Sequence, residues 1–99
     1  MTYRLRFTAA ASADLDRLFE SLADRDLPSA ERALKAIEKA WAVLEDFPFT
    51  CRKATPDNSF LRELHIPFGH SGYVALFEIE SGDTVTVLAV RHQREEDYH

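Results

Sequence analysis

The run from residue 60 to residue 92 reads FLRELHIPFGHSGYVALFEIESGDTVTVLAVRH, and this run decides the fold class. Turn-forming stretches at residues 67 to 72 and 81 to 83 divide it into three segments. The segments cover residues 60 to 66, 73 to 80 and 84 to 92. Their β-branched and aromatic residues predict three strands, and the short connections predict that neighbouring strands run antiparallel. Residues 84 to 90 are β-branched and largely apolar on both faces, as is typical of a strand inside a sheet.

The N-terminal residues add one more strand and a helix. Tyr3, Leu5 and Phe7 alternate with polar residues, so residues 3 to 8 are predicted to form a strand with one apolar face. From residue 9 the period changes, because apolar residues recur at steps of three and four. They are Leu15, Leu18, Phe19 and Leu22. This amphipathic helix is expected to end near Asp24.

A second helix follows a break at residues 26 to 29. Pro28 is accepted in a first helical turn, where its missing N–H would have no partner within the helix. The apolar residues that follow form a seam suited to an antiparallel helical hairpin: Ala30, Leu34, Ile37, Trp41 and Leu44. Pro48 stops this helix, and residues 49 to 59 carry turn-forming residues without a sustained period. We therefore expect residues 49 to 59 to form the longest loop.

These elements predict an α+β fold with the order β-α-α-β-β-β. A helical hairpin that covers one face of a small, mainly antiparallel sheet would bury the apolar surfaces of both. The length of 99 residues and a hydrophobic content of 45% suit a single domain over residues 1 to 99.

The charge balance and the cysteine content limit the classes of function. Asp and Glu total 17 against 12 Lys and Arg, a formal net charge of -5, so no field of the whole molecule attracts nucleic acid or anionic lipid. The single cysteine, Cys51, cannot form an internal disulfide, and Arg4 and Arg6 interrupt the apolar stretch that a signal peptide needs. No apolar run is long enough to span a bilayer. We expect a cytoplasmic protein without a membrane partner and without direct, specific binding of nucleic acid.

Short motifs occur along the chain in a definite order. FT at residues 7 and 8 opens an alanine-rich helix with DL at residues 14 and 15, and the second helix closes on Leu44 and FP at residues 47 and 48. LREL at residues 61 to 64 and VRHQR at residues 90 to 94 follow. In this order and spacing the motifs resemble the RelE/ParE superfamily over nearly the whole chain. Its members are the toxins of bacterial type II toxin-antitoxin modules, often described as plasmid stabilisation proteins.

The resemblance implies a cognate, ParD-like antitoxin and a hetero-oligomer with it. It leaves two mechanisms open, because ParE-like members poison DNA gyrase whereas RelE-like members cut messenger RNA in the ribosome. The leading interpretation is the ParE-like mechanism, and the alternative is a ribosome-dependent endoribonuclease. A third interpretation is an inactive protein that keeps the toxin fold and only binds its antitoxin.

RNA cleavage by attack of the 2′-hydroxyl needs a base, a cation at the phosphate and an acid at the leaving oxygen. The candidates for these roles are His92, Arg62, Arg94 and Tyr98. His92 suits acid-base chemistry near neutral pH, and Arg62 or Arg94 suits a bidentate grip on phosphate. A lone histidine at a strand end is more often a hydrogen-bonded structural residue than a catalyst. The acidic residues 95 to 97 would also repel a nearby phosphate, which favours binding over catalysis.

The residues predicted to bind the antitoxin or the target lie in the strand region and on the helical seams. They are Arg62, Arg91, His92, Arg94, Leu18, Leu22 and Leu34. Arg62 shares a strand face with apolar residues, so either that face is partly open or the guanidinium is paired, with Glu78 or Glu80 of the next strand as the candidate partner. Because arginine is favoured both in ion pairs and in interfaces, Arg62 is interpreted as structural or antitoxin-contacting ahead of catalytic.

No metal or cofactor site is predicted. His65, His70, His92, His99 and Cys51 lack the paired short spacing that builds a zinc site. The glycines, at positions 69, 72 and 82, do not form a phosphate-binding loop.

Overall fold

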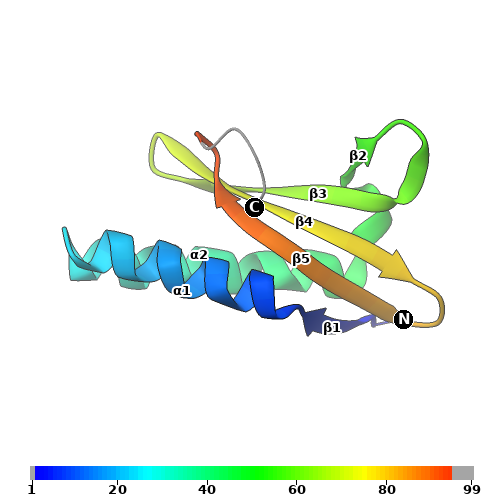
Figure 1. Ribbon diagram of the computed structural model, residues 1–99, viewed down its shortest axis with the longest axis horizontal. Coiled ribbons are helices and arrows are strands. Elements are labelled where there is room, and N and C mark those ends of the chain that lie inside the picture. Colours follow the sequence, from blue (N-terminus) through cyan, green and yellow to red (C-terminus); the bar gives the residue numbers. More distant parts are fainter. Residues whose placement is uncertain (1, 95–99) are drawn as a thin grey trace.

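The computed structural model describes residues 2 to 94 of the chain. In chain order its elements are β1 (Arg4–Phe7), α1 (Ala9–Ala23), α2 (Leu27–Asp46), the short 3-10 helix η1 (Pro48–Thr50), β2 (Arg52–Thr55), β3 (Asn58–Phe68), β4 (Ser71–Glu80) and β5 (Thr84–His92). The strands form one sheet in the order β1-β5-β4-β3-β2, in which β1 runs parallel to β5 and all other neighbours are antiparallel. Both helices lie along one face of this sheet, and no described element covers the other face (Figure 1). The predicted α+β arrangement is confirmed.

The prediction that residues 49 to 59 form a loop is wrong. The segment contains η1 and β2, and β2 pairs with β3 through Arg52 opposite Glu63 and Thr55 opposite Asn58. The β2 sequence, RKAT, shows no apolar alternation because three of its four residues are exposed at the sheet edge. Backbone pairing with β3 therefore holds this strand, with little burial of its own side chains. The sheet has five strands where the sequence predicted four.

The connection between β3 and β4 is also shorter than predicted. Only Gly69 and His70 lie between the two strands, and Gly69 has a φ of 61°, a conformation that glycine adopts at no steric cost. A side chain at Gly72 would collide with the backbone carbonyl of Ile66, so the two strands approach closely there. This tight hairpin carries Phe68 and Ser71 to the end of the sheet that lies beside α1.

The core lies between the helical hairpin and the inner face of the sheet. Its buried side chains include Leu18, Ile37, Leu44, Ile66, Tyr73, Phe77, Ile79, Val85, Val87 and Val90. Each fully buried side chain of this size stabilises the fold by about 1.5–3 kcal/mol relative to exposure. Ala11, Ala30 and Ala33 are buried as well, and their small side chains let the helices approach each other and the sheet closely.

The first turns of α1 are fixed to an irregularity in β5. Leu76 lies opposite Ala89 and Phe77 opposite Val87, so Leu88 is an extra residue in β5 and forms a bulge. The hydroxyl of Thr8 donates to the Leu88 carbonyl (3.1 Å) and accepts the N–H of Ala11 (3.0 Å), which caps α1. The buried carboxylate of Asp14 accepts the N–H of Val90 at 2.9 Å. An extra residue in a strand reverses which face of the sheet each following side chain points to. The bulge therefore places Arg91 on the face away from the helices, called the open face below, and His92 on the face toward the helices.

Candidate functional site

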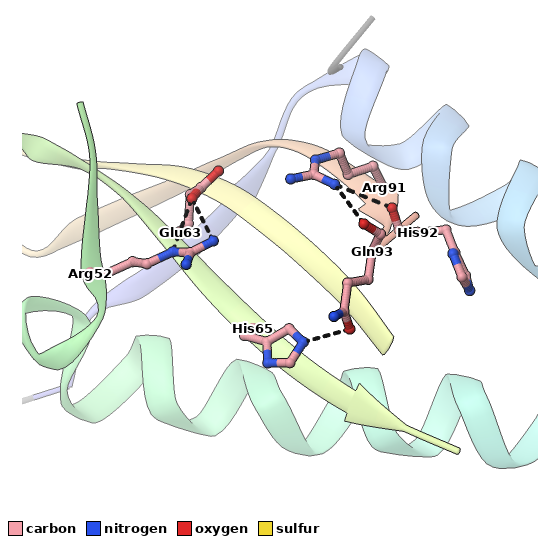
Figure 2. Close-up of polar contacts among 6 residues, drawn as sticks. All are labelled: Arg52, Glu63, His65, Arg91, His92 and Gln93. Carbon is pink, nitrogen blue, oxygen red and sulfur yellow. Dashed lines mark hydrogen bonds and ion pairs between the residues drawn. The ribbon is translucent and has the colours of Figure 1, made fainter. Parts of the chain in front are cut away.

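The face of the sheet turned away from the helices carries a polar row across three strands. The register places His65 of β3 opposite Val74 of β4, and Val74 opposite Arg91 of β5, and residues directly opposite share a face. His65 Nε2 lies 2.8 Å from Oε1 of Gln93, just after β5 (Figure 2). Arg91 Nη1 donates to the carbonyls of His92 and Gln93, each at 3.3 Å. The backbones that carry His65 and Arg91 are thus two strand spacings, about 10 Å, apart.

An ion pair lies one row further along the same face. Arg52 of β2 donates from Nε to Oε1 of Glu63 at 3.1 Å, and its Nη2 forms an ion pair with the same oxygen, also at 3.1 Å (Figure 2). The Glu63 side chain is 14% exposed, whereas that of Arg52 is 67% exposed, so the guanidinium still faces solvent. Together with the polar row, this pair gives the open face two cations beside a histidine. Such an arrangement is chemically able to hold an anionic group near an imidazole.

Arg62 lies on the opposite face, toward the helices, and is held by three main-chain carbonyls. Its Nε donates to Ser59 O at 2.8 Å, and its Nη1 donates to Phe49 O at 3.0 Å and Cys51 O at 2.8 Å. The guanidinium carbon also lies 5.2 Å from the centre of the Phe49 ring, within range of a cation–π contact. Arg62 therefore joins the start of β3 to the segment around η1.

The prediction that Glu78 or Glu80 pairs with Arg62 is wrong. Glu78 lies opposite Leu61, so it belongs to the open face, while Arg62 lies opposite Phe77. Glu80 accepts a hydrogen bond from the hydroxyl of Thr86 at 2.6 Å. Main-chain carbonyls in residues 49 to 59, the segment predicted to be a loop, accept the hydrogen bonds of Arg62 instead of a carboxylate.

His92 is hydrogen-bonded through both ring nitrogens. Its Nδ1 accepts the N–H of Arg94 at 3.1 Å, which assigns the ring proton to Nε2, and Nε2 then donates to the hydroxyl of Ser71 at 3.1 Å. The ring also stands edge-on to Tyr73, with 5.6 Å between ring centres. His92 thus ties the end of β5 to the start of β4.

His92 and Arg94 line a groove with Leu18 and Leu22. The groove has a volume of about 600 Å³ and lies between α1, the turn that joins β3 to β4, and the end of β5. Leu34 does not line this groove: the residue is 40% exposed and meets Leu18 and Leu22 in a small pocket between the two helices.

The predicted site residues are therefore distributed over several surfaces. Arg62 and His92 share the helix face but lie four residues apart along β4, at Phe77 and Tyr73, which is about 13 Å. Arg91 lies on the other face, and Tyr98 is outside the described residues. Among residues 2 to 94, the structure does not bring the candidate catalytic residues together.

Sequence reasoning does not assemble Arg52, Glu63, His65 and Gln93 into one site. The alternation in residues 61 to 66 contains part of the signal, because Glu63 and His65 fall on the face opposite Arg62. Arg52 falls in the segment predicted to be a loop, and a loop residue has no defined face. The bond between His65 and Gln93 joins residues 28 positions apart and depends on the final sheet.

The remaining sequence candidates have no catalytic geometry in the described part of the chain. Burial raises the pKa of the Cys51 thiol, and the nearby Arg62 charge and a hydrogen bond with Thr50 oppose this rise. Residues 2 to 94 contain no group of three His, Cys, Asp or Glu side chains arranged to hold a metal ion. No helix in this range is long and apolar enough to cross a membrane.

The chain is similar to known proteins over almost its whole length. Residues 5–97 match the family described as the ParE toxin of the type II toxin-antitoxin system parDE. Toxin RelE1 of Caulobacter vibrioides is 32% identical over 96 residues, covering 97% of this chain and 99% of that protein.

Solved structures show the same fold. A chain of the chromosomal ParDE toxin-antitoxin system of P. aeruginosa superposes with a TM-score of 0.71 at 20% identity, covering 92% of this chain and 96% of that one. A chain of the RelBE2 toxin-antitoxin complex of Mycobacterium tuberculosis gives a TM-score of 0.60 at 24% identity, covering 93% and 99%. The family match spans far more than half of the chain, so this protein belongs to the ParE toxin family of type II toxin-antitoxin systems.

Proposed function

We propose that this protein is a toxin that stops growth by binding DNA gyrase and that a cognate antitoxin neutralises it. Membership of the ParE toxin family supports the toxin role. Similar folds occur in a ParDE system and in a RelBE2 toxin-antitoxin complex, which supports an antitoxin as the partner. A net charge of -5 is no obstacle to a complementary protein surface, whereas docking against the phosphates of ribosomal RNA draws on many Lys and Arg side chains.

The internal bonding of Arg62 and His92 carries the choice of binding over catalysis. A cation that stabilises a scissile phosphate has to present free N–H groups, and Arg62 already donates to three carbonyls. A general acid or base has to reach the substrate, and both ring nitrogens of His92 have partners within the protein. Both residues therefore act as structural ties in this proposal.

A second candidate function, a RelE-like endoribonuclease, is favoured by the polar row on the open face. There His65, with its Nε2 bonded to Gln93, retains Nδ1 as a proton acceptor without a hydrogen-bond partner among residues 2 to 94. Arg52, whose side chain is 67% exposed although it is paired with Glu63, lies on the same face as a cation for a phosphate. In this alternative His65 would be the base, a role that the sequence alone does not assign to it.

The order in which cellular processes stop tests the proposal. The protein is expressed alone in a bacterial host, and incorporation of labelled thymidine and labelled methionine is followed after induction. We expect growth arrest in which DNA synthesis falls before protein synthesis, because gyrase acts on DNA. Coexpression of the product of the adjacent reading frame is expected to restore growth.

Two results would count against the proposal in different ways. Unimpeded growth despite soluble accumulation would contradict the toxin role in that host. An early stop in protein synthesis would favour the endoribonuclease if His65→Ala abolishes it and the matched control His70→Ala, a histidine outside the polar row, leaves it unchanged.

A further inference from the structure

The groove beside α1 differs in charge from the rest of this acidic chain. Its ionisable lining residues, the phenol of Tyr73 aside, are all basic: Arg17, Arg25, His70, His92 and Arg94. No Asp or Glu side chain is among the described residues that line it. With a formal net charge of -5 over the chain, this local excess of cations is a specific feature of the groove.

The groove has an apolar floor and a cationic rim. Leu18 and Tyr73 are buried at its base, and Leu22 and Phe68 are half-buried beside them. Arg25, His70 and Arg94 are exposed at the edges, on three different segments: the turn between α1 and α2, the turn between β3 and β4, and the residues after β5. An apolar centre surrounded by a polar rim is the layout of a protein interface.

The polar groups of the groove do not suit a small anion or an RNA strand. The two at its centre, His92 and Ser71, are bonded to each other. Sequence-tolerant binding of single strands depends on exposed aromatic faces, and Tyr73 is only 5% exposed and packs against Phe68 and His92. A segment with apolar side chains for the floor and carboxylates for the rim satisfies both parts of the groove.

We propose that this groove docks an acidic, apolar segment of the antitoxin, in which Asp or Glu side chains meet Arg25 and Arg94 while apolar side chains cover Leu18 and Leu22. This inference rests on the proposed function, because it requires an antitoxin. It goes beyond that function by assigning the surface and the chemistry of the segment that occupies it.

The test reverses two rim charges that the fold does not use. Arg25 and Arg94 contribute only their backbone N–H groups to the hydrogen bonds of the described chain, so Arg25→Glu/Arg94→Glu is expected to fold normally. Arg17 is left unchanged because it lies 3.8 Å from Asp14. The control is Arg6→Glu, an exposed cation of β1, which with a second reversal at Lys39→Glu matches the change in net charge.

Affinity for the purified product of the adjacent reading frame is measured by titration calorimetry at about 0.1 M and about 1 M salt, where charges are screened weakly and strongly. We expect the groove variant to raise Kd about tenfold or more at low salt and the control variant to change it by less than about twofold. High salt is expected to bring the groove variant and the wild type closer together.

The other outcomes distinguish failure of the groove assignment from failure of the proposed function. Equal affinity of the groove variant and the wild type, or equal losses in groove and control variants, would overturn the groove assignment and leave the proposed function intact. Unchanged antitoxin affinity with loss of binding to a single-stranded RNA oligonucleotide, or with loss of self-association in sedimentation, would assign the groove to that occupant instead. Failure of the wild type to bind the adjacent product would contradict the antitoxin-neutralised toxin itself.

Discussion

Arg62 shows how a half-buried charge can hold a segment that has few apolar side chains. The residues around η1 and β2 are mostly exposed, including the aromatic rings of Phe49 and Phe60, which meet edge to face at 6.1 Å. Arg62, a residue of β3, donates hydrogen bonds to the carbonyls of Phe49 and Cys51. Charged donors to main-chain carbonyls are worth more than neutral ones, so a single side chain orders much of this segment.

Replacement of Arg62 by Met tests this structural role. The substitution keeps most of the aliphatic stem and removes every donor, so we expect a loss of about 2–3 kcal/mol in the free energy of unfolding, measured by urea denaturation. Lys53→Met, at the exposed position opposite Arg62 on β2, is the control and is expected to change stability by less than about 0.5 kcal/mol. Unchanged stability in Arg62→Met together with lost toxicity would instead identify Arg62 as a functional residue.

The buried thiol of Cys51 is expected to make the free energy of unfolding depend on pH. Burial raises the pKa of its thiol above the ordinary value of 9.0, so the folded protein holds this proton more tightly than the unfolded chain. The stabilisation is fully present below the unfolded pKa and is lost as the pH rises through the folded pKa. We therefore expect the stability advantage of the wild type over Cys51→Ala to shrink as the pH rises through the ordinary thiol pKa of 9.0 and above it, in urea denaturation. Parallel stability curves for the two proteins over this range would show that the thiol does not titrate differently on folding.

At the scale of elements, the contact between α1 and β5 determines which residues reach which surface. Thr8 and Asp14 bind the carbonyl of Leu88 and the N–H of Val90, the groups on either side of the bulge. The bulge in turn sends Arg91 to the open face and His92 to the groove. A helix cap and a buried carboxylate thus position side chains of a strand more than 70 residues away in the sequence.

Asp14→Ala removes the acceptor and leaves the Val90 N–H buried without its partner. We expect a loss of about 1–3 kcal/mol in the free energy of unfolding and faster amide exchange at Val90, measured by denaturation and by hydrogen exchange. Asp14→Asn keeps an acceptor oxygen and is expected to lose less. Asp16→Ala, an exposed carboxylate on the same helix, is the control for the loss of an acidic residue. Equal stability of Asp14→Ala and Asp16→Ala would contradict the anchoring role of Asp14.

The elements with a regular pattern are predictable from the sequence, and the irregular ones are not. Helical periodicity locates both helices, and the β-branched run at residues 84 to 90 correctly indicates an interior strand, which lies between β1 and β4. The edge strand β2 escapes prediction because it has four residues and buries almost none of its side chains. The bulge at Leu88 cannot be predicted because residues 87 to 90 are apolar at every position, which hides a reversal of faces.

The candidate site is less predictable than the fold for the same reason. The sequence singles out His92 and Arg94, and they do line one groove with Leu18 and Leu22. Which face of the sheet stays open depends on where the helices pack. A local sequence pattern therefore cannot predict the hydrogen bond between His65 and Gln93. The carbonyl partners of Arg62 come from the η1 segment, whose conformation the sequence does not specify.

On the scale of the whole molecule, one layer of helices on one sheet face leaves two separate surfaces with cations. The groove lies beside α1 on the helix side. The polar row that contains His65 and Arg91, both labelled in Figure 2, lies on the far face. Residues on opposite faces of a sheet can be altered independently. Substitutions at the groove and at the polar row therefore test the proposed antitoxin docking and the alternative endoribonuclease chemistry separately.

Inhibition of gyrase by the purified protein is the most direct test of the proposed toxin mechanism. Relaxed plasmid, ATP and gyrase are incubated with increasing amounts of the protein, and the supercoiled product is quantified on gels. The account predicts a dose-dependent loss of supercoiling that the purified antitoxin reverses when added at equal concentration. Full supercoiling at every dose, with cleavage of ribosome-bound messenger RNA by the same preparation, would contradict it.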